Sequence, residues 1–309
     1  MHYRFKITLP VILSFLIISC IDNSEKKDIS KIDKQISPGL IFTKTDDLKE
    51  AAKDFKSYVN TDSTLEISTD IDHAQNAKKI DLELDFNQVF FIDNPRYSVP
   101  IIEVNPLTAL EFPVRIGFYN VDGEKFVVAR SEDYFLKRYN LPKSAALRSI
   151  GALSETFLKQ SSKAAYTQTS PIDSLDYNGI VTLKSSKDYK QTVTSIGKMI
   201  ENNDDLTLFE SKDFSKDAEK ISIKLKPLHL FVFGNPKVGT QLMKQNPNFS
   251  IDLPLKVLVQ GNEDEQVSVH FHDVSFTAKL HEEEFENDLP AKITKNLKEM
   301  LTEAISDEK

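Results

Sequence analysis

Residues 90–116 read FFIDNPRYSVPIIEVNPLTALEFPVRI, and residues 231–257 read FVFGNPKVGTQLMKQNPNFSIDLPLKV. Both stretches carry two Asn-Pro dipeptides and, near the end, an apolar-Pro dipeptide (Phe112-Pro113 and Leu253-Pro254), and these three dipeptides fall at the same places. Chance is a poor explanation for three such matches in one register. The two stretches are therefore predicted to be copies of one structural unit.

The repeat continues on both sides at an offset of 141 positions, so that residues 48–140 align with residues 189–281 without a gap. At its start, apolar residues follow the i, i+3, i+4, i+7 spacing of one helical face. Later the apolar residues alternate, as is typical of half-buried strands. The alternation predicts strands around residues 80–84, 114–118 and 126–128, and at their counterparts in the second copy.

A second helical pattern closes each copy, near residues 146–157 and 293–304, and initial strands are expected near 40–43 and 180–183. Each unit thus runs β-α-β4-α, and its helices are expected to cover one face of the sheet in a two-layer α+β fold. The predicted domains are residues 38–159 and 177–309. Residues 160–176, rich in Ser, Thr and Gln, are predicted to link them.

The central strands are apolar on both faces. In the first copy, Phe90 and Ile92 alternate with the equally apolar Val89 and Phe91, and residues 230–233 show the same pattern. Because helices cover only one face, the other face needs a partner. We therefore expect the copies to pack as a pseudo-symmetric pair, with a cleft along the junction bordered by the two Asn-Pro loops.

The N-terminus resembles the signal segment of a bacterial lipoprotein. Arg4 and Lys6 precede an apolar run over residues 7–18, which is too short to span a bilayer, and Ser19-Cys20 follows. Residues 1–19 are therefore predicted to be removed, leaving Cys20 as a lipidated N-terminus that anchors the protein to a membrane of the cell envelope. Residues 20–37 are polar and are predicted to form a flexible tether.

Charge and cysteine content exclude several classes of function. The formal net charge is −8 and the lysines are interspersed with acids, so nucleic acid is not an expected partner. The chain has a single cysteine, which excludes an intramolecular disulfide and paired-thiol redox chemistry. No dinucleotide fingerprint, P-loop or zinc-protease motif is present, and no cofactor is predicted.

The stretch FVFGNPKVGT at residues 231–240, followed by the second Asn-Pro and by IDLPLKV, resembles the hallmark of the domain of unknown function 302 family. The first copy is a weaker match, because Asp93 replaces the glycine and Arg96-Tyr97-Ser98 replaces the small-residue segment. The resemblance implies a two-layer β-α-β4-α fold and domains that associate in pairs. It implies no established reaction.

Histidines of the second copy are candidate metal ligands. His270 and His272 stand at i and i+2 and would share one face of a strand, and His229 on another predicted strand could supply a third ligand for zinc or copper. The alternative is that they are solvated or interface histidines. At the offset of 141 the first copy has Ala129, Ser131 and Gln88 at these positions, so any such site would belong to the second copy alone.

The Asn-Pro loops are candidate ligand sites. Exposed backbone N–H groups near Asn94 and Asn235, together with Lys237, could receive an anion. The alternative is that the Gly-Asn-Pro segment is a turn that ends a strand.

These observations favour a non-enzymatic envelope lipoprotein that binds a small molecule or an envelope protein. The alternatives are a metal-binding protein or enzyme that uses the histidines of the second copy, and a purely structural role.

Overall fold

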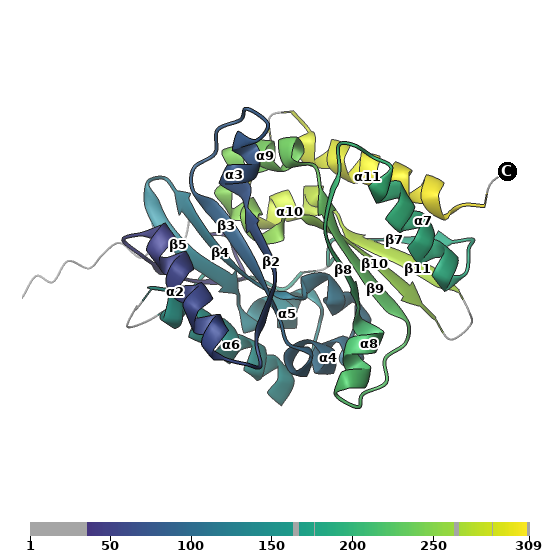
Figure 1. Ribbon diagram of the computed structural model, residues 1–309, viewed down its shortest axis with the longest axis horizontal. Coiled ribbons are helices and arrows are strands. Elements are labelled where there is room, and N and C mark those ends of the chain that lie inside the picture. Colours follow the sequence, from purple (N-terminus) through teal and green to yellow (C-terminus); the bar gives the residue numbers. More distant parts are fainter. Residues whose placement is uncertain (1–35, 163–166, 176, 263–265, 286, 308–309) are drawn as a thin grey trace, which may run out of the picture.

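The computed structural model of the chain describes residues 36–162, 167–175, 177–262, 266–285 and 287–307. Two antiparallel sheets lie side by side, each with long helices on its outer side (Figure 1). No helix within these ranges combines the length and the hydropathy that a bilayer span requires. Cys20, the signal segment and nearly all of the tether lie outside the described residues.

The first copy begins with β1 (Leu40–Lys44). The elements that follow are α2 (Leu48–Thr61), β2 (Glu66–Asp72), α3 (His73–Lys78), β3 (Asn87–Asp93), α4 (Pro95–Val104), the 3-10 helix η1 (Pro106–Glu111), β4 (Val114–Val121), β5 (Glu124–Arg130), α5 (Glu132–Arg138) and α6 (Ala145–Ser162). Within the predicted linker, residues 168–169 form β6 (Gln168–Thr169), which pairs with β1.

The second copy begins with β7 (Ile180–Ser185). The elements that follow are α7 (Tyr189–Glu201), β8 (Thr207–Asp213), α8 (Phe214–Lys220), β9 (Leu228–Gly234), α9 (Pro236–Gln245), the 3-10 helix η2 (Pro247–Asp252), β10 (Leu255–Gly261), β11 (Val267–His272), α10 (Val274–Leu280) and α11 (Leu289–Ile305).

The two copies share one order of elements, as the repeat predicts. The side chains of Asn94 and Asn235 cap α4 and α9 by accepting hydrogen bonds from the next backbone N–H groups, with proline as the first helical residue. Asn105 and Asn246 cap η1 and η2 in the same way. The Asn-Pro dipeptides therefore occupy equivalent places in the two copies.

The predicted alignment without a gap is wrong by one residue at its end. Ile116 pairs with Ala129, whereas its counterpart Val257 pairs with Phe271, so the second copy has one more residue between these strands. From β5 onward the offset is therefore 142, and α5 and α10 follow it. This shift changes the counterparts of the histidines of β11.

The predicted strands at residues 80–84 and 221–225 are also wrong. These residues form the connections from α3 to β3 and from α8 to β9, while the second strand of each copy is β2 or β8, just before the short helix. The apolar alternation has another cause: Leu84 and Leu225 pack onto core clusters from these connections. Periodicity alone cannot separate such a segment from a strand.

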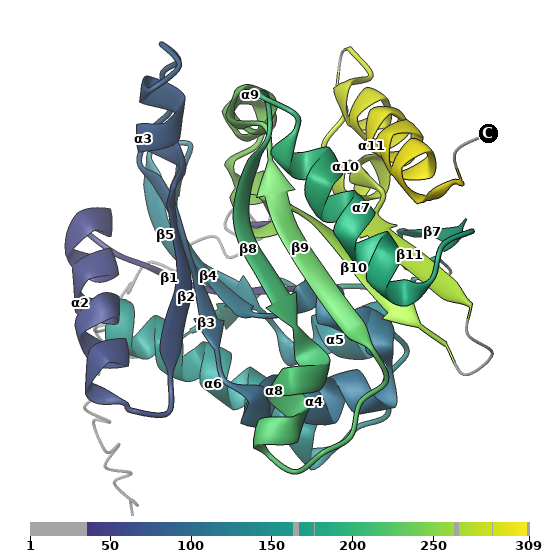
Figure 2. The same cartoon turned by 45° about the vertical axis from the view of Figure 1, so that its right-hand side comes forward.

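Each sheet buries its outer face under two helices. The strand order is β2-β3-β4-β5-β1-β6 in the first sheet and β7-β11-β10-β9-β8 in the second. The rings of Phe55 on α2 and Phe157 on α6 lie 5.3 Å apart, and Phe55 also contacts Phe90 and Phe118 of the sheet. In the second copy, α7 and α11 cover the sheet in the same way (Figure 2).

The inner faces of the two sheets are buried at the junction between the copies. Val89 and Phe91 of the first copy belong to the same hydrophobic core as Leu230, Val232 and Leu258 of the second. Packing follows a pseudo-twofold pattern, because α3 packs on α9 and its counterpart α8 packs on α4. The copies thus form the predicted pseudo-symmetric pair.

Polar contacts also join the edge strands of the two copies. On β8, Glu210 accepts hydrogen bonds from Ser68 (3.1 Å) and Thr69 (3.0 Å) of β2. Nearby, Lys212 forms an ion pair with Asp93 across the junction. These contacts lie where β2 and β8 meet (Figure 1).

Candidate functional site

A cavity of about 280 Å³ opens in the second copy around the Gly-Asn-Pro turn. β9 ends at Gly234, Asn235 caps α9, and α9 runs beside the cavity opposite α11. The apolar lining consists of Leu206, Phe209, Phe233, Pro236, Val238, Leu242, Met243, Leu253, Pro254, Leu255, Ile293, Leu297 and Met300. A mostly apolar lining with a few polar groups is typical of small-molecule sites, and the volume is near the lower end of their range.

The first copy contributes polar groups to the wall of this cavity. His73 and Asn76 of α3 line it, because α3 packs on α9 across the junction. Burial lowers the pKa of His73 to about 4, so its imidazole is neutral at pH 7. Its Nε2 atom is buried and has no hydrogen-bond partner among the described residues.

The same place in the first copy is filled. There the corresponding elements enclose a space of about 0 Å³. Tyr97 and Phe112 stand at the positions of Val238 and Leu253 and line the closed space, so larger side chains occupy the volume that is open in the second copy. The cavity is therefore specific to the second copy.

The structure places the predicted ligand residues at the two Asn-Pro turns. Asn235 lines the cavity, whereas Asn94 lines only the filled counterpart. Both side-chain oxygens are engaged as helix caps, at 2.9 Å from the backbone nitrogens of Arg96 and Lys237. The Lys237 side chain is exposed and is not part of the cavity lining. Both asparagine side chains are thus engaged in structural helix capping at the turn.

The three candidate histidines do not come together. His270 and His272 share the inner face of the second sheet, but His229 lies on the opposite face, because its cross-strand neighbour Val259 pairs with Val269. Among the described residues, no group of three or more His, Cys, Asp or Glu side chains is placed to hold a metal ion. A single site that uses all three histidines is therefore not formed.

Each histidine has a protein partner. His229 Nε2 lies 2.8 Å from Ser211 Oγ, and His270 Nδ1 lies 2.9 Å from Thr182 Oγ1. His272 faces the junction between the copies, where it contacts Tyr139 of the first copy. With the corrected offset, the first-copy counterparts of His270 and His272 are Val128 and Arg130.

A buried polar cluster lies at this junction, and it repeats the pseudo-twofold symmetry of the pair. Glu111 at the end of η1 accepts a hydrogen bond from Tyr139 of its own copy (2.7 Å) and lies 3.4 Å from His272 of the other. Its counterpart Asp252 lies 2.7 Å from His281 of its own copy and 2.5 Å from Arg130 of the other.

The pKa values of the two carboxylates follow from these contacts. Burial opposes ionisation of Glu111, but His272, Arg138 and Arg115 hold its pKa well below the usual value. Burial likewise opposes ionisation of Asp252, whose pKa Arg130 and the hydrogen bond from His281 hold well below its usual range. Both carboxylates are therefore ionised at pH 7.

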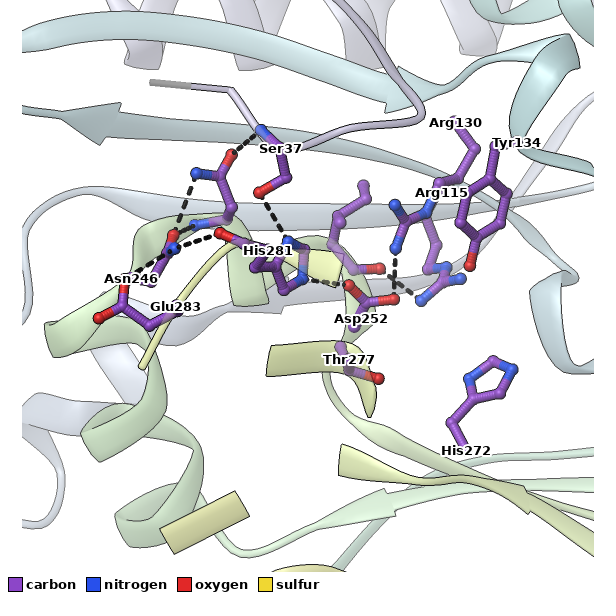
Figure 3. Close-up of polar contacts among 12 residues, drawn as sticks. Ser37, Arg115, Arg130, Tyr134, Asn246, Asp252, His272, Thr277, His281 and Glu283 are labelled. Carbon is purple, nitrogen blue, oxygen red and sulfur yellow. Dashed lines mark hydrogen bonds and ion pairs between the residues drawn. The ribbon is translucent and has the colours of Figure 1, made fainter. Parts of the chain in front are cut away.

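A polar chain leads from the cluster to the start of the described residues. Because Asp252 is ionised, His281 donates from Nε2 to it, and Nδ1 of the ring lies 2.7 Å from the Ser37 hydroxyl (Figure 3). Asn246 in turn donates to the His281 carbonyl at 3.4 Å, as Asn105 does to the Tyr139 carbonyl at 3.2 Å. The second Asn-Pro motif of each copy thus positions the side chain that contacts the carboxylate.

Comparison with known proteins identifies the family. The sequence model described as "Domain of unknown function DUF302" matches residues 41–156 and 181–306. The chain belongs to the DUF302 family. The match confirms the family resemblance of the second copy and extends it to the weaker first copy of this DUF302 pair.

Other relatives cover only part of the chain. A crystal structure of an uncharacterized conserved DUF302 protein from Bacillus stearothermophilus superposes with a TM-score of 0.35 and 11% identity, covering 41% of this chain and 95% of that one. "Fluoride-specific ion channel FluC 1" of Brucella suis is 25% identical over 111 residues, or 36% of this chain and 43% of the channel. "Fluoride-specific ion channel FluC 2" of Brucella melitensis is also 25% identical over 111 residues. The DUF302 pair thus matches about two fifths of the length of these curated relatives.

Sequence reasoning missed the polar cluster, although the sequence holds a signal for it. Both copies carry an acid, then proline two residues later, then a basic residue two residues after that: Glu111 and Arg115 in the first, Asp252 and Lys256 in the second. A repeated acid-base pair at the end of an apolar stretch points to buried charges. Their partners across the junction could not be identified without the packing of the two copies.

Proposed function

We propose that this DUF302 pair is a non-enzymatic binding module of the cell envelope, and that its second copy holds a small, mainly apolar molecule. The observation that carries the proposal is the contrast between the copies. The same elements enclose about 280 Å³ in the second copy and about 0 Å³ in the first. A repeat that keeps its fold but leaves one of two equivalent spaces open points to a binding role for that space.

The lining favours a ligand with an apolar body and a small polar group. The walls are mainly aliphatic side chains with Phe209 and Phe233, so burying apolar ligand surface there contributes about 25 cal/mol per Å². Polar side chains of His73, Asn76 and Asn296 stand among them and can orient one hydrogen-bonding group.

Filling the cavity with the side chains of the first copy should strongly weaken binding. We expect Val238→Tyr combined with Leu253→Phe to weaken binding of the apolar dye N-phenyl-1-naphthylamine by at least about tenfold, a change of about 1.4 kcal/mol. The tyrosine and phenylalanine would occupy the ligand volume, as Tyr97 and Phe112 do in the first copy. Titration of dye fluorescence measures the effect, with no tryptophan background in this chain.

A matched control places the same residue change outside the cavity. Val104 at the end of α4 is 56% exposed, so Val104→Tyr should leave dye affinity unchanged. Equal dye affinity in the wild type and in the filled variant, with both folded, would count against the proposal.

The envelope location rests on the N-terminal sequence. We propose that Cys20 is acylated and that the DUF302 pair is held near a membrane by the tether. Cys20→Ala should move the protein from the membrane fraction to the soluble fraction of its native host, because the anchor is lost. Immunoblotting of the two fractions measures this, and Ser19→Ala serves as the control, since alanine preserves a small residue before the cysteine. Recovery of the unchanged protein in the soluble fraction would refute the anchor.

A further inference from the structure

Among the described residues, the polar cluster at the junction holds more basic than acidic groups. Three arginines, Arg115, Arg130 and Arg138, and Lys256 are all at least 96% buried there, and the carboxylates among them are Glu111 and Asp252. Buried charges are expensive unless they are paired and fully hydrogen-bonded. The surplus of basic groups therefore calls for additional negative charge.

Lys256 is the basic group that the cluster leaves unpaired. Its first-copy counterpart Arg115 donates to Glu111 at 2.6 Å and to the backbone carbonyl of Ile251 across the junction. Asp252 is one methylene shorter than Glu111, and its oxygens are engaged by Arg130 and His281. Within the described part of the chain, Lys256 Nζ is buried and has no hydrogen-bond partner. Burial lowers the pKa of this amine well below its usual value, and a bound anion would favour the protonated ammonium.

A small cavity adjoins Lys256. Its volume is about 10 Å³, and Asp252, His272 and Thr277 line it together with Lys256. This is about the space that one water-sized species occupies. Leu253, Leu255 and Leu297 line both this cavity and the larger one of the second copy, so the two cavities are neighbours.

We propose that this cavity is a binding site for a single small inorganic anion of halide size, held by the Lys256 ammonium and by the surplus positive charge of the arginines. The anion would pair with the protonated amine and offset the excess of buried arginines over carboxylates among the described residues. The cavity has room for about one water-sized species, so it is too small for a sulfate. The site is distinct from the apolar cavity, and the anion would contribute to the stability of the pair rather than to binding of the apolar ligand.

Halide-dependent stability of the full chain tests the site. Thermal melts in sodium fluoride, chloride and bromide should show a midpoint that rises with halide concentration and saturates, compared with sodium sulfate at equal ionic strength. Lys256→Met should remove the saturable rise or shift it to at least tenfold higher halide concentration. Methionine has a similar volume and removes the amine that would bind the anion. Lys237→Met, at the exposed lysine beside the Asn-Pro turn, should retain the wild-type response.

A second measurement keeps the test independent of the variant's folding. Crystals of the wild-type protein grown in sodium bromide should show an anomalous peak within about 3.5 Å of Lys256 Nζ, the reach of a hydrogen bond to a large anion. The proposal is overturned if that position holds a water molecule without anomalous signal, or if the halides and sulfate stabilise wild type and Lys256→Met equally. A halide response lost in Lys237→Met would instead place the anion at the turn.

Discussion

Acidification from pH 6.5 to pH 4 is expected to lower the free energy of unfolding of the pair by about 6 kcal/mol. Burial lowers the pKa values of His73 and His270 to about 4, whereas an unfolded histidine has a pKa of about 6.5. Between these values the unfolded chain binds more protons than the folded chain, so stability falls as the pH falls. Each histidine should cost about 3 kcal/mol over this window, at about 1.4 kcal/mol per pH unit.

Chemical denaturation at several pH values measures this loss, and the repeat supplies the control. His73→Phe and His270→Val introduce the residue types that the other copy has at these positions, Phe214 and Val128. Each variant should flatten the dependence of unfolding free energy on pH between 6.5 and 4. A slope unchanged in both variants would contradict the assignment of acid sensitivity to these histidines.

Loss of Asp252 is expected to destabilise the pair by about 3–5 kcal/mol, the usual cost of leaving a buried charge without its partner. Asp252→Ala would strand Arg130, which is 3% exposed and reaches the carboxylate at 2.5 Å across the junction. Adding Arg130→Met should recover much of the lost stability, because the unpaired charge is then gone. Urea denaturation of the single and double variants measures both effects.

The exposed pair Lys159 and Glu155 on α6 provides the comparison, since its side chains are 46% and 49% exposed. Glu155→Ala should change the unfolding free energy by at most about 0.5 kcal/mol. If Asp252→Ala costs no more than Glu155→Ala, the ion pair across the junction does not hold the two copies together.

Much of the fold could be predicted from the sequence because it contains two copies of one unit, and features that recur in both copies mark the same structural positions. The Asn-Pro dipeptides mark helix caps in both copies, and the apolar residues on both sides of the central strands indicate a buried junction. The edge strands β2 and β8 escaped prediction. Their sequences, EISTDID and TLFESKD, lack a clean apolar alternation, because an edge strand is held by backbone pairing to one neighbour and by side chains across the junction.

The candidate site was only partly predictable. The hallmark turn and Asn235 mark the cavity, and the change from Tyr97 to Val238 is visible in the aligned copies. The contribution of α3 to the cavity depends on how the copies pack, which no local pattern encodes. One extra residue before β11 also hid the fact that His272 and Arg130 are counterparts that face each other's carboxylates.

The central claim is that the cavity of the second copy binds a small apolar molecule, and the contents of the purified protein test it most directly. Native mass spectrometry of the full mature protein from its own host, followed by organic extraction, should reveal one class of small apolar molecule at up to one per chain. The variant that combines Val238→Tyr with Leu253→Phe should lack it, while Val104→Tyr retains it. Recovery of the same molecule in equal amount from the filled variant would contradict the account. So would a wild-type protein that is purified without a ligand and also fails to bind added apolar molecules.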